Sequence, residues 1–447
     1  MNYAKNINKM KSFIFYFSFF ILSAGVLMGQ SLPKYYTETL ENGLKVVAIP
    51  MDNGSNVVST NIFYNVGSRN ETMGKSGIAH MLEHLNFKST KNLKAGEFDE
   101  IVKSFGGVNN ASTSFDYTKY YIKSSSKNMD ESLKLFADLM ENLTLKDEEF
   151  QPERDVVAEE RRWRTDNNPM GYLQYRLFNN SYIYHPYHWT PIGFTSDIKT
   201  WTIDDIRDFH STFYQPKNAV VVVAGDITKE KVFDSTKKYF KDIKNEKAIP
   251  TVHTVEPKQD GEKSLVVYKD TQVQMLAISY HIPNYEDKDQ VALSALSELL
   301  SSGKSSYLQK ELVDKKRLVN SIYAYNMELT DPGVFIFMAV CNENVKAKDV
   351  KKEIDLIIKN IKAGKVSKKD IEKIKINTKA DFIFSLENSS SVASLYGSYF
   401  VRGNIKPLFE YEQKVEKLTK DDIINVAKKY LNKENSTTVI LKKRKSE

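Results

Sequence analysis

The chain has 447 residues, which is too many for one ordinary hydrophobic core and predicts at least two domains. Its formal charge is +7, and three lysines within the first 29 residues leave +4 for the remainder. This mild and dispersed positive charge does not favour nucleic acid as a partner.

Residues 1–29 have the composition of a secretory signal peptide. Lysines come first, an apolar run from Ser12 to Leu27 follows, and the small residue Gly29 precedes Gln30. The run is short for a membrane crossing, which needs about 20 residues. We therefore expect an exported, periplasmic chain. An uncleaved leader that keeps the chain attached to a membrane is the alternative.

Two strands are predicted next along the chain. Residues 45–49 are a lysine followed by four apolar residues, two of them valine and one isoleucine. Residues 57–66 alternate in polarity, which is typical of a strand with one buried face. Residues 76–85 follow directly, and their apolar positions predict a helix that packs against a core.

The helix predicted at residues 76–85 carries His80 and His84 four residues apart, with Glu83 between them on the same face. Two neutral imidazoles at this spacing suit a zinc ion. A carboxylate beside the metal can accept a proton from water, which is the role open to Glu83. The order H-x-x-E-H is the inverzincin signature. Chance placement on an ordinary helix is the alternative.

A third metal ligand is expected from acidic residues further along the chain. Residues 129–143 predict an amphipathic helix, and a helix rich in Glu and Arg follows it. Glu153 and Glu160 are seven residues apart, so they share one face of that helix. A solvated helix with internal ion pairs would show the same mixture of charges.

Further motifs run through the first half of the chain in a fixed order. They are Gly67-Ser68-Arg69-Asn70-Glu71, Gly77, Gly106-Gly107, Asn110-Ala111, Thr113, Thr118, Tyr120, Glu153-Arg154, Glu160, His185-Pro186-Tyr187, Gly193, Tyr214-Gln215-Pro216-Lys217-Asn218 and Gly225-Asp226. Together with the H-x-x-E-H motif, they resemble the pitrilysin/insulinase family of zinc metallopeptidases. The length is similar to that of its processing-peptidase-like bacterial subgroup.

The resemblance implies a role for each matching residue. His80, His84 and Glu160 would bind one zinc ion per chain, and Glu83 would act as the general base. Glu153 would support a ligating histidine, because such histidines usually donate their second N–H to a carboxylate or carbonyl. The implied activity is that of a zinc-dependent endopeptidase that hydrolyses peptides or unfolded protein segments in a closed chamber.

Substrate in this family is pictured as adding an extended strand to a sheet edge near the metal. The matching segment is residues 109–113, in which Asn110 and Ala111 would bind the substrate backbone. Such backbone pairing tolerates many peptide sequences. A plain edge strand without this role is the alternative.

Internal duplication predicts the domain organisation. The sequence TIDDI at residues 202–206 recurs as TKDDI at residues 419–423. Residues 248–263 have the composition of a linker. We therefore expect this segment to separate a metal-binding domain at 30–247 from a homologous domain at 264–447. The expected fold class is α+β. The resemblance implies two mixed α/β domains, each an antiparallel sheet with helices on one face, that close as a clamshell.

The second half departs from the family pattern. The positions equivalent to the metal motif carry Ala295, Glu298 and Leu299. Self-sufficient relatives also have an arginine and a tyrosine in this half, where this chain has Val313 and Asn320. The resemblance therefore implies a heterodimer with a sister subunit that supplies the Arg/Tyr pair. A non-catalytic structural or assembly subunit of the same fold is the alternative function.

Overall fold

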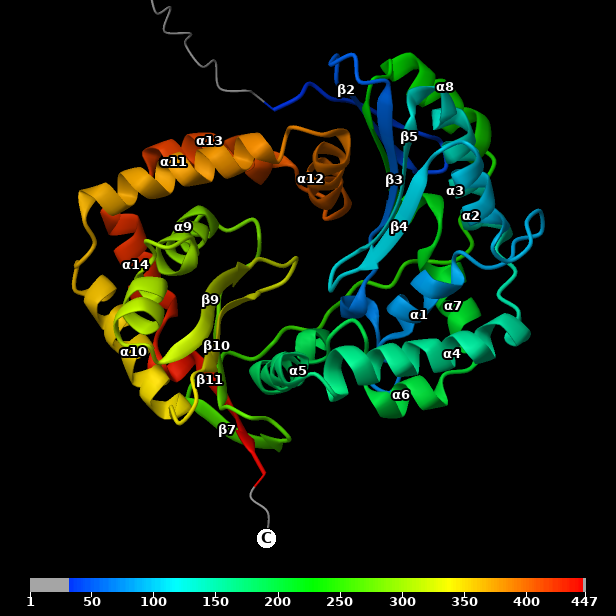
Figure 1. The fold of residues 1–447 in the computed structure, drawn as a ribbon. Helices are drawn as coiled ribbons and strands as arrows, with labels where there is room; N and C mark the ends of the chain where they lie inside the picture. The colour runs from blue at the N-terminus through cyan, green and yellow to red at the C-terminus, as the bar shows by residue number, and fades with distance from the viewer. Residues whose placement is uncertain (1–31, 445–447) are drawn as a thin grey trace, which may run out of the picture. The chain divides into compact units, whose positions relative to one another are not determined.

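The computed structural model describes residues 32–444, which form two mixed α/β halves, each built on one sheet (Figure 1). The signal peptide predicted at residues 1–29 lies outside the described residues. Between residues 32 and 444, none of the helices combines the length and the apolar content that a membrane crossing needs.

The first sheet has six strands in the order β1-β2-β6-β3-β5-β4. β6 pairs in parallel with β2 and antiparallel with β3. Its sequence AVVVVAG is buried along its whole length, as expected for a strand covered on both faces. The strands are β1 (Tyr36–Thr39), β2 (Lys45–Pro50), β3 (Val57–Tyr64), β4 (Val108–Thr113), β5 (Thr118–Ser125) and β6 (Ala219–Gly225).

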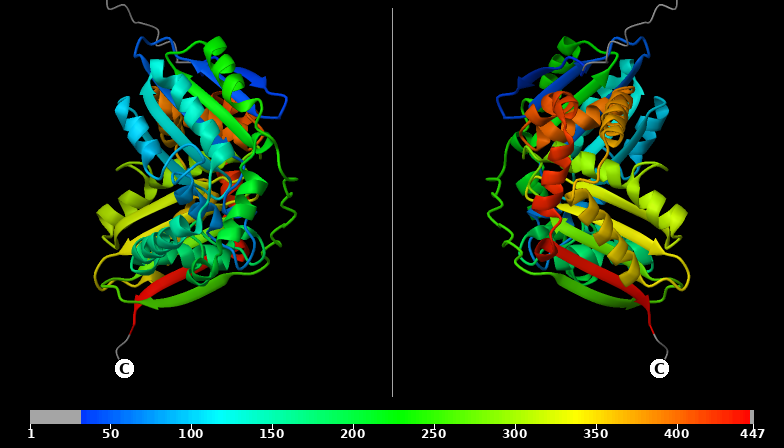
Figure 2. Two further views of the ribbon diagram at one scale, coloured as in Figure 1. Left: turned by 90° about the vertical axis from the view of Figure 1, so that its right-hand side faces the viewer. Right: turned by 90° about the vertical axis from the view of Figure 1, so that its left-hand side faces the viewer.

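The second sheet repeats this arrangement with five strands in the order β7-β11-β8-β10-β9. β11 pairs in parallel with β7, beside which it runs in Figure 2, and antiparallel with β8. The matching strand order and directions confirm the two similar halves that the internal repeat predicts. The strands are β7 (Lys263–Lys269), β8 (Met275–His281), β9 (Val319–Met327), β10 (Val334–Cys341) and β11 (Ser436–Lys443).

Helices of each half cover one face of its own sheet and form its core. In the first half these are α1 (Ile78–Leu85), α2 (Glu97–Ser104), α3 (Met129–Asn142), α4 (Asp147–Arg161), α6 (Thr195–Thr200), α7 (Ile203–Phe213) and α8 (Lys229–Phe240). In the second half they are α9 (Gln290–Ser301), α10 (Ala347–Lys362), α11 (Lys368–Phe384) and α14 (Lys420–Tyr430).

The other face of each sheet is covered by a helix from the opposite half, as Figure 1 shows for α5 (Pro169–Ser181) and α12 (Ser389–Val401). α12 packs on β3 and β6, while α5 packs on β8 and β11. The approach of α12 is close, because a Cβ atom at Gly397 would overlap the ring of Phe63. α13 (Lys406–Lys417) follows α12. Each sheet is therefore covered on both faces, whereas the predicted fold has helices on one face only.

The turn between β9 and β10 is fixed to the first half by partly buried polar contacts. Asp331 pairs with Arg69 and lies 3.0 Å from Nε2 of His185, and the backbone N–H of Thr330 donates to Asp116. Burial raises the pKa of Asp331, but the hydrogen bonds with His185 and Arg69 outweigh it and lower the pKa. Two of the sequence motifs therefore join the halves of the chain. The predicted domain bounds at 247 and 264 stay a prediction.

Candidate metal centre

Helix α1 presents its polar face to α4 and buries its apolar face in the core of the first half. The buried side chains are Ile78, Ala79, Met81, Leu82 and Leu85. His80, Glu83 and His84 occupy the remaining positions of the same two turns. The 3.6-residue period of the helix thus produces the polar island that the sequence predicts.

The start of α1 is held by a buried carboxylate that sequence reasoning did not assign. Glu71 accepts hydrogen bonds from the backbone N–H groups of Gly77 and Ala79 at 2.8 and 2.9 Å and from Nε1 of Trp189 at 2.7 Å. These bonds satisfy N–H groups that a helix start leaves without intrahelical partners. Burial, despite these opposing bonds, raises the pKa of Glu71 to about 8. Glu71 therefore fixes where the helix with both histidines begins.

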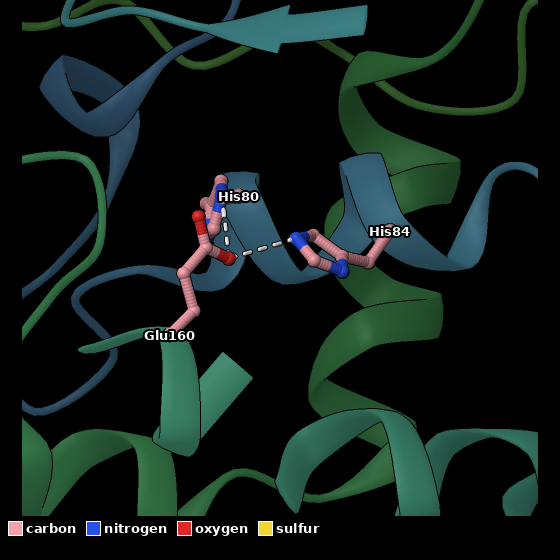
Figure 3. A group of neighbouring side chains, drawn as sticks. All are labelled: His80, His84 and Glu160. Carbon is pink, nitrogen blue, oxygen red and sulfur yellow. Dashed lines mark ion pairs between the residues drawn. The ribbon is translucent and has the colours of Figure 1, made fainter. Parts of the chain in front are cut away.

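Three potential ligands converge between α1 and α4, as Figure 3 shows. Oε2 of Glu160 lies 3.3 Å from Nε2 of His84 and 3.7 Å from Nε2 of His80. Ligand atoms about 2.1 Å from a tetrahedral ion lie about 3.4 Å apart, so the spacing fits zinc. The donor set of two imidazoles and one carboxylate also fits, and it leaves a fourth position open as catalytic zinc sites do.

The two histidines differ in their protonation. Burial, together with the charge of His84, lowers the pKa of His80 to about 4, so His80 is a neutral imidazole. Burial lowers the pKa of His84 as well, but hydrogen bonds to Glu153 and Glu160 outweigh it and raise the pKa to about 9. A metal binds neutral imidazole, so it would take the place of the proton that His84 shares with Glu160.

A carboxylate behind His84 orients its ring. Oε1 of Glu153 lies 2.8 Å from Nδ1 of His84, and Oε2 lies 2.6 Å from Nζ of Lys88. The histidine thus keeps Nε2 directed at Glu160 while Nδ1 is held from the other side. Glu153 occupies the supporting position that the resemblance implies, and Lys88 adds a partner that the sequence did not reveal.

Replacing Glu153 by alanine is expected to weaken zinc binding by about 10- to 100-fold, because His84 would lose the group that fixes its ring and its tautomer. Competition with a chromophoric chelator measures this affinity. Glu148→Ala is the matched control, because Glu148 is exposed on the same helix. Equal zinc affinity in the two variants would show that Glu153 does not support the ligand.

Glu83 faces the edge strand of the first sheet. Its Oε2 accepts a hydrogen bond of 2.5 Å from Oγ1 of Thr113, which is the last residue of β4. Burial raises the pKa of Glu83, with the bond from Thr113 acting in the opposite direction. A carboxylate with a raised pKa is better suited to exchange protons near neutral pH. Thr113 therefore links the candidate base to the strand predicted to bind substrate.

The loop that contains Gly193 connects the C-terminal end of α4 with the N-terminal end of α1. Arg161, buried at the end of α4, donates to the carbonyl of Gly193, and its guanidinium lies 4.4 Å from the centre of the Tyr175 ring. Gly193 packs against Gly77, whose φ of +86° starts α1. Arg161, which follows Glu160 in the chain, thereby sets the position of that ligand relative to α1.

All seven predicted site residues border one cavity of about 1230 Å³. They are His80, Glu83, His84, Asn110, Ala111, Glu153 and Glu160. β4, which carries Asn110 and Ala111, forms the edge of its sheet, as predicted. Val313 packs against the core of the second half, and Asn320 is exposed on the edge strand β9. The chemical roles of these seven residues stay predictions.

Comparison with known proteins gives the chain its family. The sequence profile of the insulinase family, peptidase family M16, matches residues 46–188, and that of the peptidase M16 inactive domain matches residues 200–378. Zinc protease PqqE of Helicobacter pylori is 56% identical over 424 residues, which cover 94% of this chain and 96% of the relative. These matches agree with a half that carries the metal motif and a half that lacks it.

A second relative and a solved structure extend the comparison. A probable mitochondrial-processing peptidase subunit beta of Arabidopsis thaliana is 25% identical over 415 residues, covering 90% of this chain and 77% of the relative. The crystal structure of a protease from Helicobacter pylori, 56% identical, covers 92% of this chain and 100% of that one with a TM-score of 0.91. The relatives' names support a protease-type function and zinc as the metal. The chain belongs to the insulinase family, peptidase family M16, as its motifs predict.

Proposed function

We propose that the chain is a zinc-dependent endopeptidase. The observation that carries the proposal is the convergence of His80, His84 and Glu160 within 4.8 Å of one another, beside Glu83 and in a cavity bordered by a sheet edge. A structural or assembly subunit has no need of such a set. The complete set of donors therefore favours catalysis over the alternative of a non-catalytic subunit.

The chain's own residues would carry most of the reaction. A zinc ion, when bound, supplies a Lewis acid that polarises the scissile carbonyl and makes water more acidic. The edge strand β4 would hold the substrate backbone in an extended form through main-chain hydrogen bonds. Glu83 would take a proton from the attacking water and deliver it to the leaving amine. Thr113 holds Glu83 in place before substrate arrives.

We further propose that activity depends on a sister subunit of the same family. Neither Val313 nor Asn320 can replace the Arg/Tyr pair, because valine has no donor and an asparagine amide is shorter than a phenol. The name of the plant relative, a subunit beta of a processing peptidase, agrees with paired assembly in this family. The sister would then contribute the missing donors for substrate and oxyanion.

Mixing experiments test the activity and the pairing together. The purified chain alone is expected to hydrolyse an unfolded protein slowly, and adding the family member that co-purifies with it from its source cells should restore turnover. The same mixture made with Glu83→Gln should stay inactive, which assigns the chemistry to this chain. Full turnover of the isolated monomer would contradict the pairing.

Export to the periplasm is also part of the proposal, because lysines followed by an apolar run and a small residue form the pattern of a leader. Amino-terminal sequencing of the native protein tests it. A mature chain that begins at Gln30 is expected. An intact leader would favour the membrane-attached alternative.

A further inference from the structure

The charged side chains that line the cavity beside the candidate metal centre are each paired with a neighbouring group. Glu83 bonds to Thr113, and Glu153 bonds to His84 and Lys88. Arg164, whose side chain is 63% exposed, pairs with Glu160 at 2.9 Å. Apart from these residues and the two histidines, the side chains that line the cavity within the described part of the chain are uncharged. No carboxylate there is left without a partner to bind a basic substrate residue.

The uncharged lining includes large apolar groups from several separate segments of the chain. Phe87 follows α1, Trp163 lies beyond the end of α4, and Met170 belongs to the start of α5. Phe115 also borders the cavity, as do Pro191 and Ile192 from the loop that leads to α6. A peptide bound along β4 would therefore place side chains against apolar surface close to the metal centre.

Trp163 has an unusual degree of exposure. The other two tryptophans of the chain are buried, with 3% and 1% of their surface accessible, whereas Trp163 is 72% exposed. A bare indole leaves a large apolar surface in water, and surfaces of this kind mark contact sites. Trp163 thus offers an aromatic face that the described part of the chain leaves mostly uncovered.

The position of Trp163 connects this face to the reaction. It lies on η3 (Arg162–Asp166), a π-helical turn that continues α4 only two residues after Glu160. Such turns are frequent at functional sites. Arg164 on the same turn contacts the carboxylate of Glu160. A substrate side chain that packs on Trp163 would consequently lie next to the peptide bond that is to be cleaved at the metal.

We propose that Trp163 is a specificity-determining residue that packs against a large apolar or aromatic side chain of the peptide substrate, next to the scissile bond. The chain then prefers peptides with phenylalanine or leucine at that position over peptides with aspartate or arginine. The inference rests on the proposed peptidase function and adds the class of substrate to it.

A peptide series that differs at one residue beside the scissile bond tests the preference, with Phe, Leu, Ala, Asp or Arg at that residue. The active enzyme, including its partner subunit, should favour Phe and Leu. Trp163→Ala should lower kcat/KM for these two peptides by about 10- to 100-fold, mainly through KM, and should lower it for the Ala peptide by a smaller factor, so that the preference is lost. Trp163→Phe should retain most of the preference.

Two controls separate this effect from damage to the fold or to the metal centre. Phe384→Ala removes another aromatic side chain, which is 60% exposed and lies outside the cavity lining, and it should keep the wild-type preference. Trp163→Ala should also bind zinc with wild-type stoichiometry, because its side chain is not a ligand. Loss of zinc from this variant would overturn the specificity role.

A binding measurement gives a readout that is independent of turnover. In the Glu83→Gln background, adding the Phe peptide should shift tryptophan emission to shorter wavelength as Trp163 becomes covered, and Trp163→Phe should abolish the shift. Normal hydrolysis without any preference, or with a preference that Trp163→Ala retains, would overturn this inference alone. Absence of both zinc and hydrolysis in the complete wild-type enzyme would overturn the proposed function and this inference with it.

Discussion

Glu83→Gln is expected to abolish peptide hydrolysis while leaving zinc binding intact. Glutamine keeps the size of the side chain and can still accept the hydrogen bond from Thr113. It cannot take a proton from water, and loss of a general base typically lowers a rate by about 100- to 10,000-fold. Initial rates on an unfolded protein, measured with metal content on the same sample, check both parts.

The paired measurement makes this result specific. An inactive variant without zinc would point to damage at the metal centre, whereas an inactive variant with zinc assigns the lost step to the carboxylate. Retention of wild-type turnover by the zinc-loaded Glu83→Gln enzyme would remove Glu83 from the mechanism.

Glu160→Ala is expected to weaken zinc binding by more than about 100-fold, because removing a ligand should cost more than the 10- to 100-fold typical of a supporting residue. Its neighbour supplies the matched control. Glu159 is 65% exposed and pairs with Arg162 on the outside of the helix, so Glu159→Ala should bind zinc like the wild type. Chelator competition on both variants measures the difference.

This pair of variants tests whether Glu160, and not the adjacent glutamate, is the third zinc ligand. Glu160 lies two helical turns from Glu153 and shares its face, whereas Glu159 lies one residue off that face. Similar zinc affinities for the two variants, or a larger loss in Glu159→Ala, would show that another residue completes the site.

The centre of the site was predictable because its spacing rules are local. Four residues place His80 and His84 on one face of a helix, and seven residues do the same for Glu153 and Glu160. The two interpretations of the Glu- and Arg-rich helix, a metal ligand and a solvated ion pair, both apply to α4. Glu160 turns toward the histidines, while Glu159 forms the solvated ion pair expected of an ordinary charged helix.

The supporting contacts were not predictable, because they join segments that are far apart in the sequence. Nothing near Glu71 indicates that it caps a helix several residues later together with Trp189. Thr113 matched a family motif, but its contact with Glu83 depends on how the edge strand crosses α1. Trp163 was missed because a single aromatic residue in a charged helix carries no periodic signal.

The fold shows the same division between local and long-range information. The internal repeat predicted two similar halves, and the two sheets share their strand order. Packing of α5 and α12 onto the opposite halves depends on tertiary contacts such as that between Gly397 and Phe63. The sequence of either helix alone cannot reveal which sheet it covers.

Anomalous diffraction from crystals of the purified protein, collected above and below the zinc absorption edge, shows directly whether the chain holds zinc between its two histidines and Glu160. One zinc peak is expected between α1 and α4, about 2.0–2.2 Å from Nε2 of His80, Nε2 of His84 and a carboxylate oxygen of Glu160. A zinc peak bound by other residues, or His80, His84 and Glu160 too far apart to share one ion in the crystal, would rule out the proposed zinc site.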